Sequence, residues 1–376
     1  MQKYAIIKTM QVKNNYNECL TNLACSIRNY FGLPFNHKTL EFIDEYLEEH
    51  EPTNVVVILL DGMGTKIIER TLPEDSFFRK NLAKSITTVF PATTTAATTS
   101  IRTGLNPVEH GWLGWTTYIK PIDKVITLFM NSEKGHDGET CEEFLGVKNK
   151  LASETIVDEI NKQGKFKGLE LMPFGENAYN SLDDMLEKIK AETKKPGKKY
   201  IYAYDVEPDG TMHETGPDSG ASKKLIIERN DKIEQLAKEL KDTLLIVLSD
   251  HGHIKVKNIF LNKYPDILDL LDRKTSIDQR AVAFKVKDGK KEEFRNKFEN
   301  YFGNTSYDLY DTKDVVESKL FGDGLENELF EPALGDFLAI AKSTECLVAP
   351  GDEVLVSHHA GYTDDEVYVP IIVKQC

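Results

Sequence analysis

The stretch Val55-Val56-Val57-Ile58-Leu59-Leu60-Asp61-Gly62 decides the fold class of this chain. Its apolar run is too continuous for a strand with one solvated face, and it is typical of a parallel strand buried on both faces. The run ends in a carboxylate next to a glycine. We therefore expect a parallel sheet whose strand ends present polar side chains to a ligand.

Strand-like and helical segments alternate along the rest of the chain, which predicts a doubly wound α/β fold with a mostly parallel sheet between layers of helices. The helical segments are 20–30, 40–47, 182–192 and 219–241. The strand-like segments are 86–90, 126–130, 200–204 and 244–248, and the main sheet is expected to resume at 337–341 and to close with 367–373.

A charge-rich stretch interrupts this alternation and predicts an inserted α+β cap domain at 255–345. The chain is too long for one simple core, which favours such an elaborated organisation. The main domain is then expected to consist of 1–254 and 346–376, with 1–50 as a helical N-terminal extension.

The composition limits the partners of this chain. Its 376 residues include 61 acidic and 47 basic side chains, for a net charge of −14. This balance argues against binding of polymeric nucleic acid by a basic surface, whereas a small anionic substrate is compatible if bound metal ions dominate the local field. No apolar run approaches the roughly 18 residues of a membrane helix, so no membrane partner is expected. The oligomeric state is left open.

The cysteines and the first residues indicate a compartment. The cysteines are odd in number and scattered, without a Cys-x-x-Cys pair, which is typical of free thiols in a reducing environment: Cys19, Cys25, Cys141, Cys346 and Cys376. Residues 1–16 lack the apolar segment of a secretory signal. We expect a cytoplasmic protein.

Two motifs in the first third of the chain are candidates for chemistry. Asp61 ends a strand beside glycine, where it can bind a cation, although a turn or helix cap also explains an aspartate there. The run Thr93-Thr94-Thr95 follows Pro91 and precedes more hydroxyl residues. A threonine at a helix N-terminus beside a divalent ion can act as a nucleophile towards a phosphoryl group; simple helix capping is the alternative.

Two aspartate–histidine pairs follow later strands. Asp209 and His213 are four residues apart, so a helical turn would place both on one face, where they could hold one ion. Asp250 and His251 come directly after an apolar strand and before glycine, a position that packing does not explain. We expect His253 to be a neighbour and not a ligand.

The adjacent histidines His358 and His359 form the last motif. One of them is expected to be a ligand, and the residue pattern alone does not select between them. Together the motifs offer the carboxylate, imidazole and hydroxyl groups that two adjacent divalent ions require.

In this order and at these distances, the motifs resemble the alkaline phosphatase superfamily, most closely its nucleotide pyrophosphatase/phosphodiesterase branch, the type I phosphodiesterases. The resemblance spans about 55–375 apart from the cap. It implies an alkaline phosphatase-like catalytic domain. In that family the nucleophile is a threonine three residues after the proline of a Phe-Pro segment, which is Thr94 here. The last ligand, a histidine before Gly-Tyr, is best matched by His359.

The resemblance also implies two metal sites. One ion would be held by Asp61, Asp250, His251 and the Thr94 oxygen, and the other by Asp209, His213 and His359. Thr94 would attack phosphorus in line and form a phosphothreonine, which water then hydrolyses. Mixed histidine and carboxylate ligands favour zinc, and manganese or iron would also fit.

Two departures from the family pattern concern the substrate pocket. The family follows its nucleophile with an aromatic residue of the leaving-group pocket, where this chain has Thr95. It also holds a phosphoryl oxygen with an asparagine, at whose position this chain has Trp115. Thr116, Thr117 or a backbone amide would then replace that donor. Trp112 and Trp115 are expected either to stack on a base or aryl group or to pack in the core.

The function expected from this resemblance is a two-metal hydrolase of phosphodiester or pyrophosphate bonds in small substrates, nucleotides among them. The alternatives within the superfamily are a phosphomonoesterase, a phosphonate hydrolase or a phosphomutase. A catalytically silent protein that binds a metal or ligand is the alternative from another class.

Overall fold

The computed structural model describes residues 13–136, 138–152, 154–303 and 305–376. Six strands of these ranges form the central sheet: β1 (Asn54–Leu60), β2 (Leu82–Thr87), β6 (Lys167–Leu171), β7 (Lys199–Asp205), β8 (Thr243–Leu248) and β17 (Tyr368–Gln375). Their order is β2-β17-β8-β1-β7-β6. The last four strands of that order run parallel, and β17 is antiparallel to both neighbours. The carboxyl ends of β1, β7 and β8 therefore meet at one edge.

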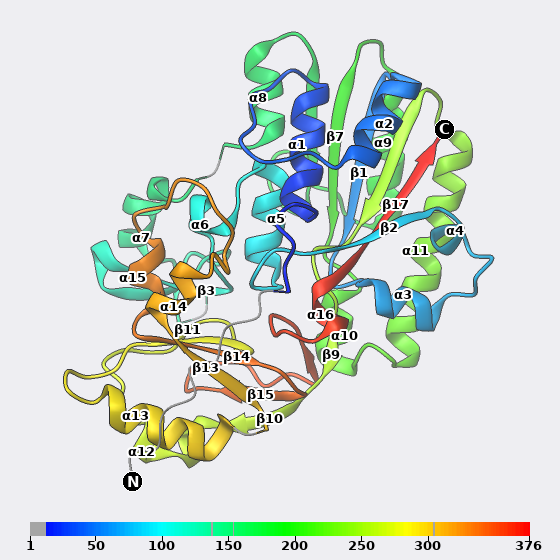
Figure 1. Cartoon of the computed structure of the whole chain (residues 1–376). Helices are drawn as coiled ribbons and strands as arrows, with labels where there is room; N and C mark the ends of the chain where they lie inside the picture. The colour runs from blue at the N-terminus through cyan, green and yellow to red at the C-terminus, as the bar shows by residue number, and fades with distance from the viewer. Residues whose placement is uncertain (1–12, 137, 153, 304) are drawn as a thin grey trace.

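Helices cover both faces of this sheet (Figure 1). One face carries α1 (Leu20–Tyr30), α2 (Glu41–His50), α5 (Thr94–Thr103) and α8 (Ile156–Gln163). The other carries α3 (Thr65–Thr71), α4 (Phe77–Lys80), α9 (Leu182–Thr193) and α11 (Gly220–Glu239). β1 shows why both faces are covered, because Val55, Val57 and Leu59 enter one core and their neighbours the other. The predicted α/β fold is confirmed.

A second, antiparallel sheet lies beside the first (Figure 1). Within the described ranges its order is β13-β14-β12-β11-β3-β4-β5. The strands are β3 (Thr116–Ile119), β4 (Lys124–Thr127), β5 (Ser132–Glu133), β11 (Ser276–Ile277), β12 (Ala281–Phe284), β13 (Tyr307–Asp311) and β14 (Phe337–Ala341). A phenylalanine-rich core joins it to α12 (Pro265–Leu268) and α13 (Lys291–Phe298), and α14 (Thr312–Glu317) and α15 (Phe330–Leu334) pack nearby.

One expectation about the main sheet is wrong. Residues Phe337–Ala341 form β14, which pairs with β12 and β13 in the second sheet. The segment is buried at every position, as expected of an inner strand, but an apolar run does not specify which sheet it joins. Strands from 116–133 complete the same sheet, so it combines part of the predicted cap with an earlier segment. The domain boundaries at 254/255 and 345/346 stay a prediction.

A buried ion pair links the second sheet to the segment before β17. Arg280, next to β12, donates from Nε and Nη2 to the Glu366 carboxylate at 2.6 and 2.8 Å. Glu366 lies in α16 (Asp364–Val367), and both side chains are fully buried. The guanidinium also donates to the carbonyls of Ser343 and Glu345. This bidentate pair fixes how the two sheets meet near the last motif.

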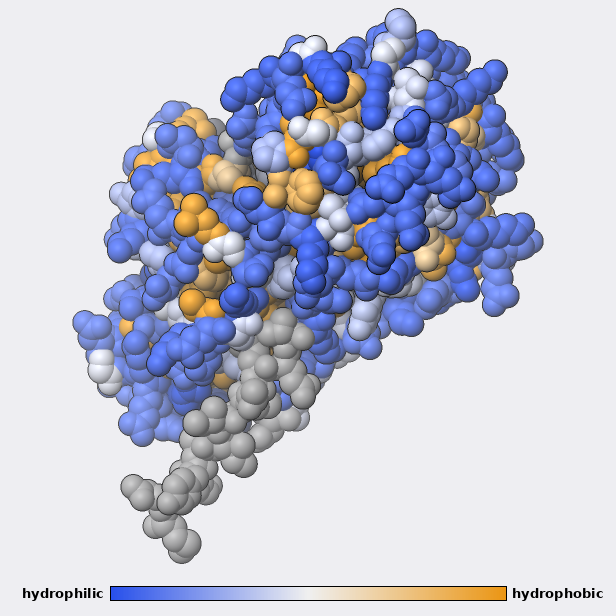
Figure 2. Space-filling model, turned by 45° about the horizontal axis from the view of Figure 1, so that its top comes forward, coloured by the Kyte–Doolittle hydropathy of each residue, from blue (hydrophilic) through white to orange (hydrophobic). Residues whose placement is uncertain are grey.

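The remaining α-helices and strands of the described ranges are short: α6 (Pro107–His110), α7 (Glu142–Val147), α10 (Asp209–Thr215), β9 (Ile254–Lys255) paired with β16 (Ser357–His358), and β10 (Lys257–Phe260) paired with β15 (Glu345–Val348). Hydrophilic residues predominate on the face shown in Figure 2. Among the helices of the described residues, none has the length and apolar character needed to cross a bilayer. Residues 1–12 of the predicted N-terminal extension lie outside the described residues.

Candidate active site

All seven predicted metal ligands meet at the carboxyl edge of the central sheet. Asp61 directly follows β1, and Asp250 and His251 follow β8. Asp209 and His213 lie one turn apart on α10, which follows β7 after a short loop. Thr94 is the first residue of α5, and His359 follows β16. Parallel strands that end together thus gather residues that are far apart in sequence.

The Thr94 hydroxyl lies at the centre of this arrangement. Its Oγ1 is 3.3 and 3.4 Å from the carboxylate oxygens of Asp61 and 3.1 Å from His251 Nε2. The side chain is buried at the N-terminus of α5, where backbone amides and the helix dipole favour negative charge. The position suits an oxygen that bonds to a phosphoryl group.

Asp61, Asp250 and His251 form the first cluster around Thr94. His251 Nε2 is 3.2 Å from Asp61 Oδ1 and 3.5 Å from Asp250 Oδ2. The other oxygen of Asp250 accepts from the amides of Gly62 and His251, which leaves Asp250 Oδ2 buried without a hydrogen-bond partner. A buried carboxylate oxygen without a hydrogen-bond partner is unfavourable, and a cation bound between it and the imidazole would remove that cost.

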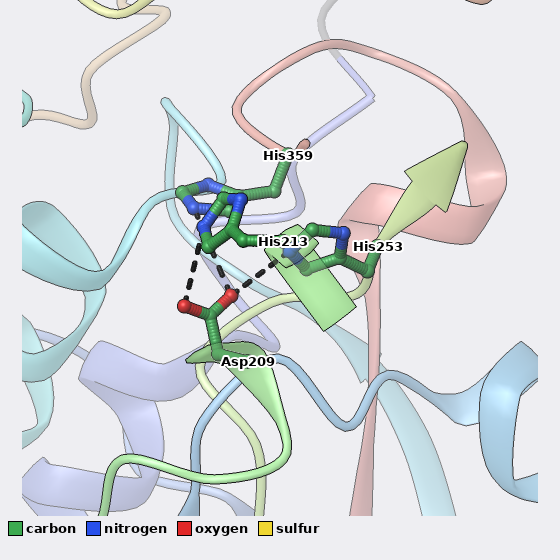
Figure 3. A group of neighbouring side chains, drawn as sticks. All are labelled: Asp209, His213, His253 and His359. Carbon is green, nitrogen blue, oxygen red and sulfur yellow. Dashed lines mark ion pairs between the residues drawn. The ribbon is translucent and has the colours of Figure 1, made fainter. Parts of the chain in front are cut away.

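The second cluster is built around Asp209 (Figure 3). Its carboxylate oxygens are 3.2 Å from His213 Nε2, 3.0 Å from His253 Nε2 and 3.9 Å from His359 Nε2. The ligand atoms of these four residues lie within 4.8 Å of one another, and so do those of Asp61, Asp209 and His251. Each set could hold a metal ion, and Asp209 belongs to both.

Backbone carbonyls orient three of the imidazoles. The Nδ1 atoms of His213, His251 and His359 lie 2.9, 3.1 and 3.0 Å from the carbonyl oxygens of Ser357, Gly252 and Ala92. A carbonyl only accepts, so each Nδ1 carries a hydrogen and each Nε2 is free to bind a proton or a metal. This is the arrangement that metal-binding histidines adopt.

The electrostatics show that the site lacks positive charge. Burial raises the pKa of Asp61 well above its usual range, and the carboxylates of Asp250 and Asp209 raise it further. Burial lowers the pKa of His251, but Asp250 and Asp61 outweigh this effect and raise it to about 10. Asp209 likewise outweighs burial and raises the pKa of His213 to about 9. The imidazoles of His251 and His213 thus hold protons where divalent cations would fit, whereas burial lowers the pKa of His359 well below its usual value.

A cavity of about 330 Å³ opens onto Thr94, Asp209, His213 and His359. Trp115 lines it and is 39% exposed. Trp112 is buried in a separate core and donates its indole hydrogen to the Ala152 carbonyl. Trp112 and Thr95 are not among the described residues that line the cavity. Of the residues expected at the substrate, Trp115 and Thr116 therefore line the cavity, where they can contact one.

Sequence reasoning missed three residues near the site. Tyr204, on β7, donates a hydrogen bond to Asp61; its alternation with Tyr200 and Tyr202 was the only signal. Asp278 follows β11, lines the cavity and accepts from Thr93 Oγ1 at 3.0 Å; burial raises its pKa to about 7. Lys134 also lines the cavity and pairs with Asp352 at 2.6 Å. The last two come from the second sheet and its loops and belong to no sequence motif.

The chain has an alkaline phosphatase-like fold, in which the edge of a mostly parallel sheet gathers a threonine and two Asp/His clusters. The chain belongs to the type I phosphodiesterase / nucleotide pyrophosphatase family, whose family model matches residues 55–344. Membership of this family supports a hydrolase that acts on phosphodiester or pyrophosphate bonds.

Solved structures show the same fold. Murine ectonucleotide pyrophosphatase / phosphodiesterase 5, as an inactive variant in complex with AMP, has a TM-score of 0.66 and 19% identity over 85% of this chain and 87% of that chain. The human protein of the same name has a TM-score of 0.63 and 18% identity over 85% and 87%.

Proposed function

We propose that the protein is a two-metal hydrolase that cleaves phosphodiester or pyrophosphate bonds of small substrates, nucleotides among them, with Thr94 as the nucleophile. The observation that carries the proposal is the position of Thr94 Oγ1, at a helix N-terminus, against Asp61 and His251, on a cavity. Membership of the type I phosphodiesterase family supports the same chemistry.

The donor atoms fit two divalent ions. Asp61, Asp250, His251 and Thr94 would hold one, and Asp209, His213 and His359 the other. The orphan Asp250 Oδ2 and the carbonyl-oriented imidazoles support this assignment. Bound divalent ions supply positive charge to phosphoryl oxygens and make hydroxyl groups more acidic. The mixture of imidazole and carboxylate donors favours zinc, and manganese or iron also fits.

The protein groups would then act in a defined order. Thr94 Oγ1 loses its proton to water and attacks phosphorus, while the bond to the leaving oxygen breaks on the opposite side and that oxygen takes up a proton from water. The amides at the N-terminus of α5 stabilise the charge on the phosphoryl oxygens. Water then cleaves the phosphothreonine and restores the Thr94 hydroxyl.

The cavity supports a substrate with an aromatic or nucleoside group. Trp115 lines it together with Thr94, and its indole can stack on a base or aryl ring. AMP bound to the murine structural relative is in line with a nucleotide-like substrate.

The test compares zinc-loaded protein on bis-p-nitrophenyl phosphate and on p-nitrophenyl phosphate. A Thr94-dependent preference for the diester is expected and would justify a screen of nucleotides. A preference for the monoester would instead indicate a phosphomonoesterase or phosphomutase. A metal-loaded protein without activity on either substrate would favour a catalytically silent protein that binds a metal or ligand.

A further inference from the structure

We propose that His253 is a fourth protein ligand of the ion at Asp209, His213 and His359. The inference rests on the proposed two-ion site and adds a residue to it. It also changes the expectation that His253 is only a neighbour.

The position of His253 brings it into the second cluster. The residue is fully buried just before β9, and its Nε2 is 3.0 Å from Asp209 Oδ1. Its ring centroid is 4.5 Å from that of His213, and the planes are inclined at 76°. The two rings thus approach the Asp209 carboxylate from different directions (Figure 3).

The hydrogen bonds of Ser357 decide which nitrogen of His253 is free. Ser357 Oγ donates its single hydrogen to the Met212 carbonyl. The same oxygen is 2.8 Å from His253 Nδ1, so it must accept a hydrogen from that nitrogen. In the neutral ring, Nε2 then carries a lone pair and no hydrogen, 3.0 Å from Asp209 Oδ1.

Two buried hydrogen-bond acceptors, one from Asp209 and one from His253, therefore lie next to each other. Asp209 Oδ1 and His253 Nε2 both lack a hydrogen-bond partner among the described residues. Such an arrangement is unfavourable unless a cation lies between the two atoms. A divalent ion would supply that charge, because the ligand atoms of Asp209, His213, His253 and His359 all lie within 4.8 Å of one another.

His358 provides a contrast within the same cluster. Its ring centroid is 5.2 Å from that of His213, yet its Nδ1 accepts from the His359 amide at 2.9 Å. This ring lies near the cluster without belonging to the group of ligand atoms that meet within 4.8 Å. Four protein donors, three of them imidazoles, form the type of set that holds zinc tightly.

The test measures metal binding and needs no turnover. Metal-free wild-type protein, His253→Asn and His358→Asn are titrated with zinc against a chromophoric chelator. Asparagine can keep the hydrogen bond that each Nδ1 makes, and it removes the Nε2 atom. We expect two ions in the wild type, one site weakened at least about tenfold in His253→Asn, and little change in His358→Asn.

Cobalt gives a second readout, since loss of a ligand changes the visible absorption of bound Co²⁺. His253→Asn should alter this spectrum and His358→Asn should not. Ser357→Ala, which removes the oxygen that orients His253, should weaken the same zinc site if His253→Asn fails to fold. Wild-type zinc affinities and an unchanged spectrum in His253→Asn, or wild-type affinities in a folded Ser357→Ala, would overturn the inference. A wild-type protein that binds no divalent ion would instead refute the proposed function.

Discussion

Three neighbouring threonines differ in what their hydroxyl groups contact. Thr93 Oγ1 donates to Asp278, and Thr95 Oγ1 is buried without a partner among the described residues. Thr94 Oγ1 alone of the three lies against Asp61 and His251. The three residues are consecutive at the start of α5, yet their hydroxyl groups point to different surroundings. The family spacing after Pro91 selects the same threonine.

Removing the Thr94 hydroxyl should abolish turnover of diesters. We expect Thr94→Ala to lower kcat by at least about 10³-fold, as for loss of other nucleophiles, because no covalent phosphothreonine can form. The ion assigned to Asp209, His213 and His359 should still bind. Thr99→Ala, which removes a hydroxyl bonded within the same helix, is the matched control. A Thr94→Ala protein with near wild-type kcat would exclude Thr94 as the nucleophile.

Zinc affinity should depend on pH through the histidines. The pKa values of about 10 for His251 and about 9 for His213 mean that zinc must displace their protons at neutral pH. Affinity should therefore rise from about pH 6 to 9, by up to about tenfold per pH unit for each proton released. Competition titrations across this range check the sign, and constant affinity would contradict it.

At the scale of secondary structure, strand ends were the predictable part of the site. A continuous apolar run followed by Asp61 or by Asp250-His251 indicates both a buried strand and a ligand at its carboxyl end. Close packing explains the glycine at position 252, because a Cβ there would lie 1.8 Å from the Asp365 carbonyl oxygen. The assignment of Phe337–Ala341 to the main sheet was wrong, because apolar character predicts that a strand is buried and does not predict which strand it pairs with.

The Arg280–Glu366 pair should be worth several kcal/mol to the link between the two sheets. Breaking a buried pair leaves an unpaired charge, so Glu366→Gln should lower the free energy of unfolding by about 3–5 kcal/mol. Glu317→Gln, which breaks an exposed pair with Lys313, should cost at most about 1 kcal/mol. Urea unfolding at neutral pH measures both. Equal, small effects would show that the buried pair does not hold the sheets together.

The Glu366 contribution should also depend on pH. Burial alone would raise the pKa of this carboxyl, but Arg280 outweighs it and holds the pKa below the usual value. The stabilisation is thus present above the pKa of an unfolded glutamate, about 4.3, and is lost as the pH falls further.

At the scale of the whole molecule, part of the lining of the cavity could not be predicted from the sequence. Its metal-facing wall comes from the motifs at the strand ends. The cavity is also lined by Lys134 and Asp278, from the second sheet and its loops, and by Asp352, from the segment between β15 and β16. These are ordinary charged residues in the sequence, and only long-range strand pairing places them at the site.

Metal removal should destabilise the entire fold. The ligands come from segments between residues 61 and 359, so a bound ion links the ends of several strands. At a free zinc concentration 100-fold above Kd, each ion should add about 2.7 kcal/mol to the free energy of unfolding. Urea titrations with zinc or with a chelator measure this difference. Identical midpoints would contradict metal binding at this site.

The most direct test of the central claim is the stereochemical course at phosphorus. Zinc-loaded protein would hydrolyse a phosphorothioate diester of known configuration in isotopically labelled water. Attack by Thr94 followed by attack of water gives two in-line inversions, so net retention is expected. Net inversion would mean that water attacks the substrate directly, and it would contradict a threonine nucleophile.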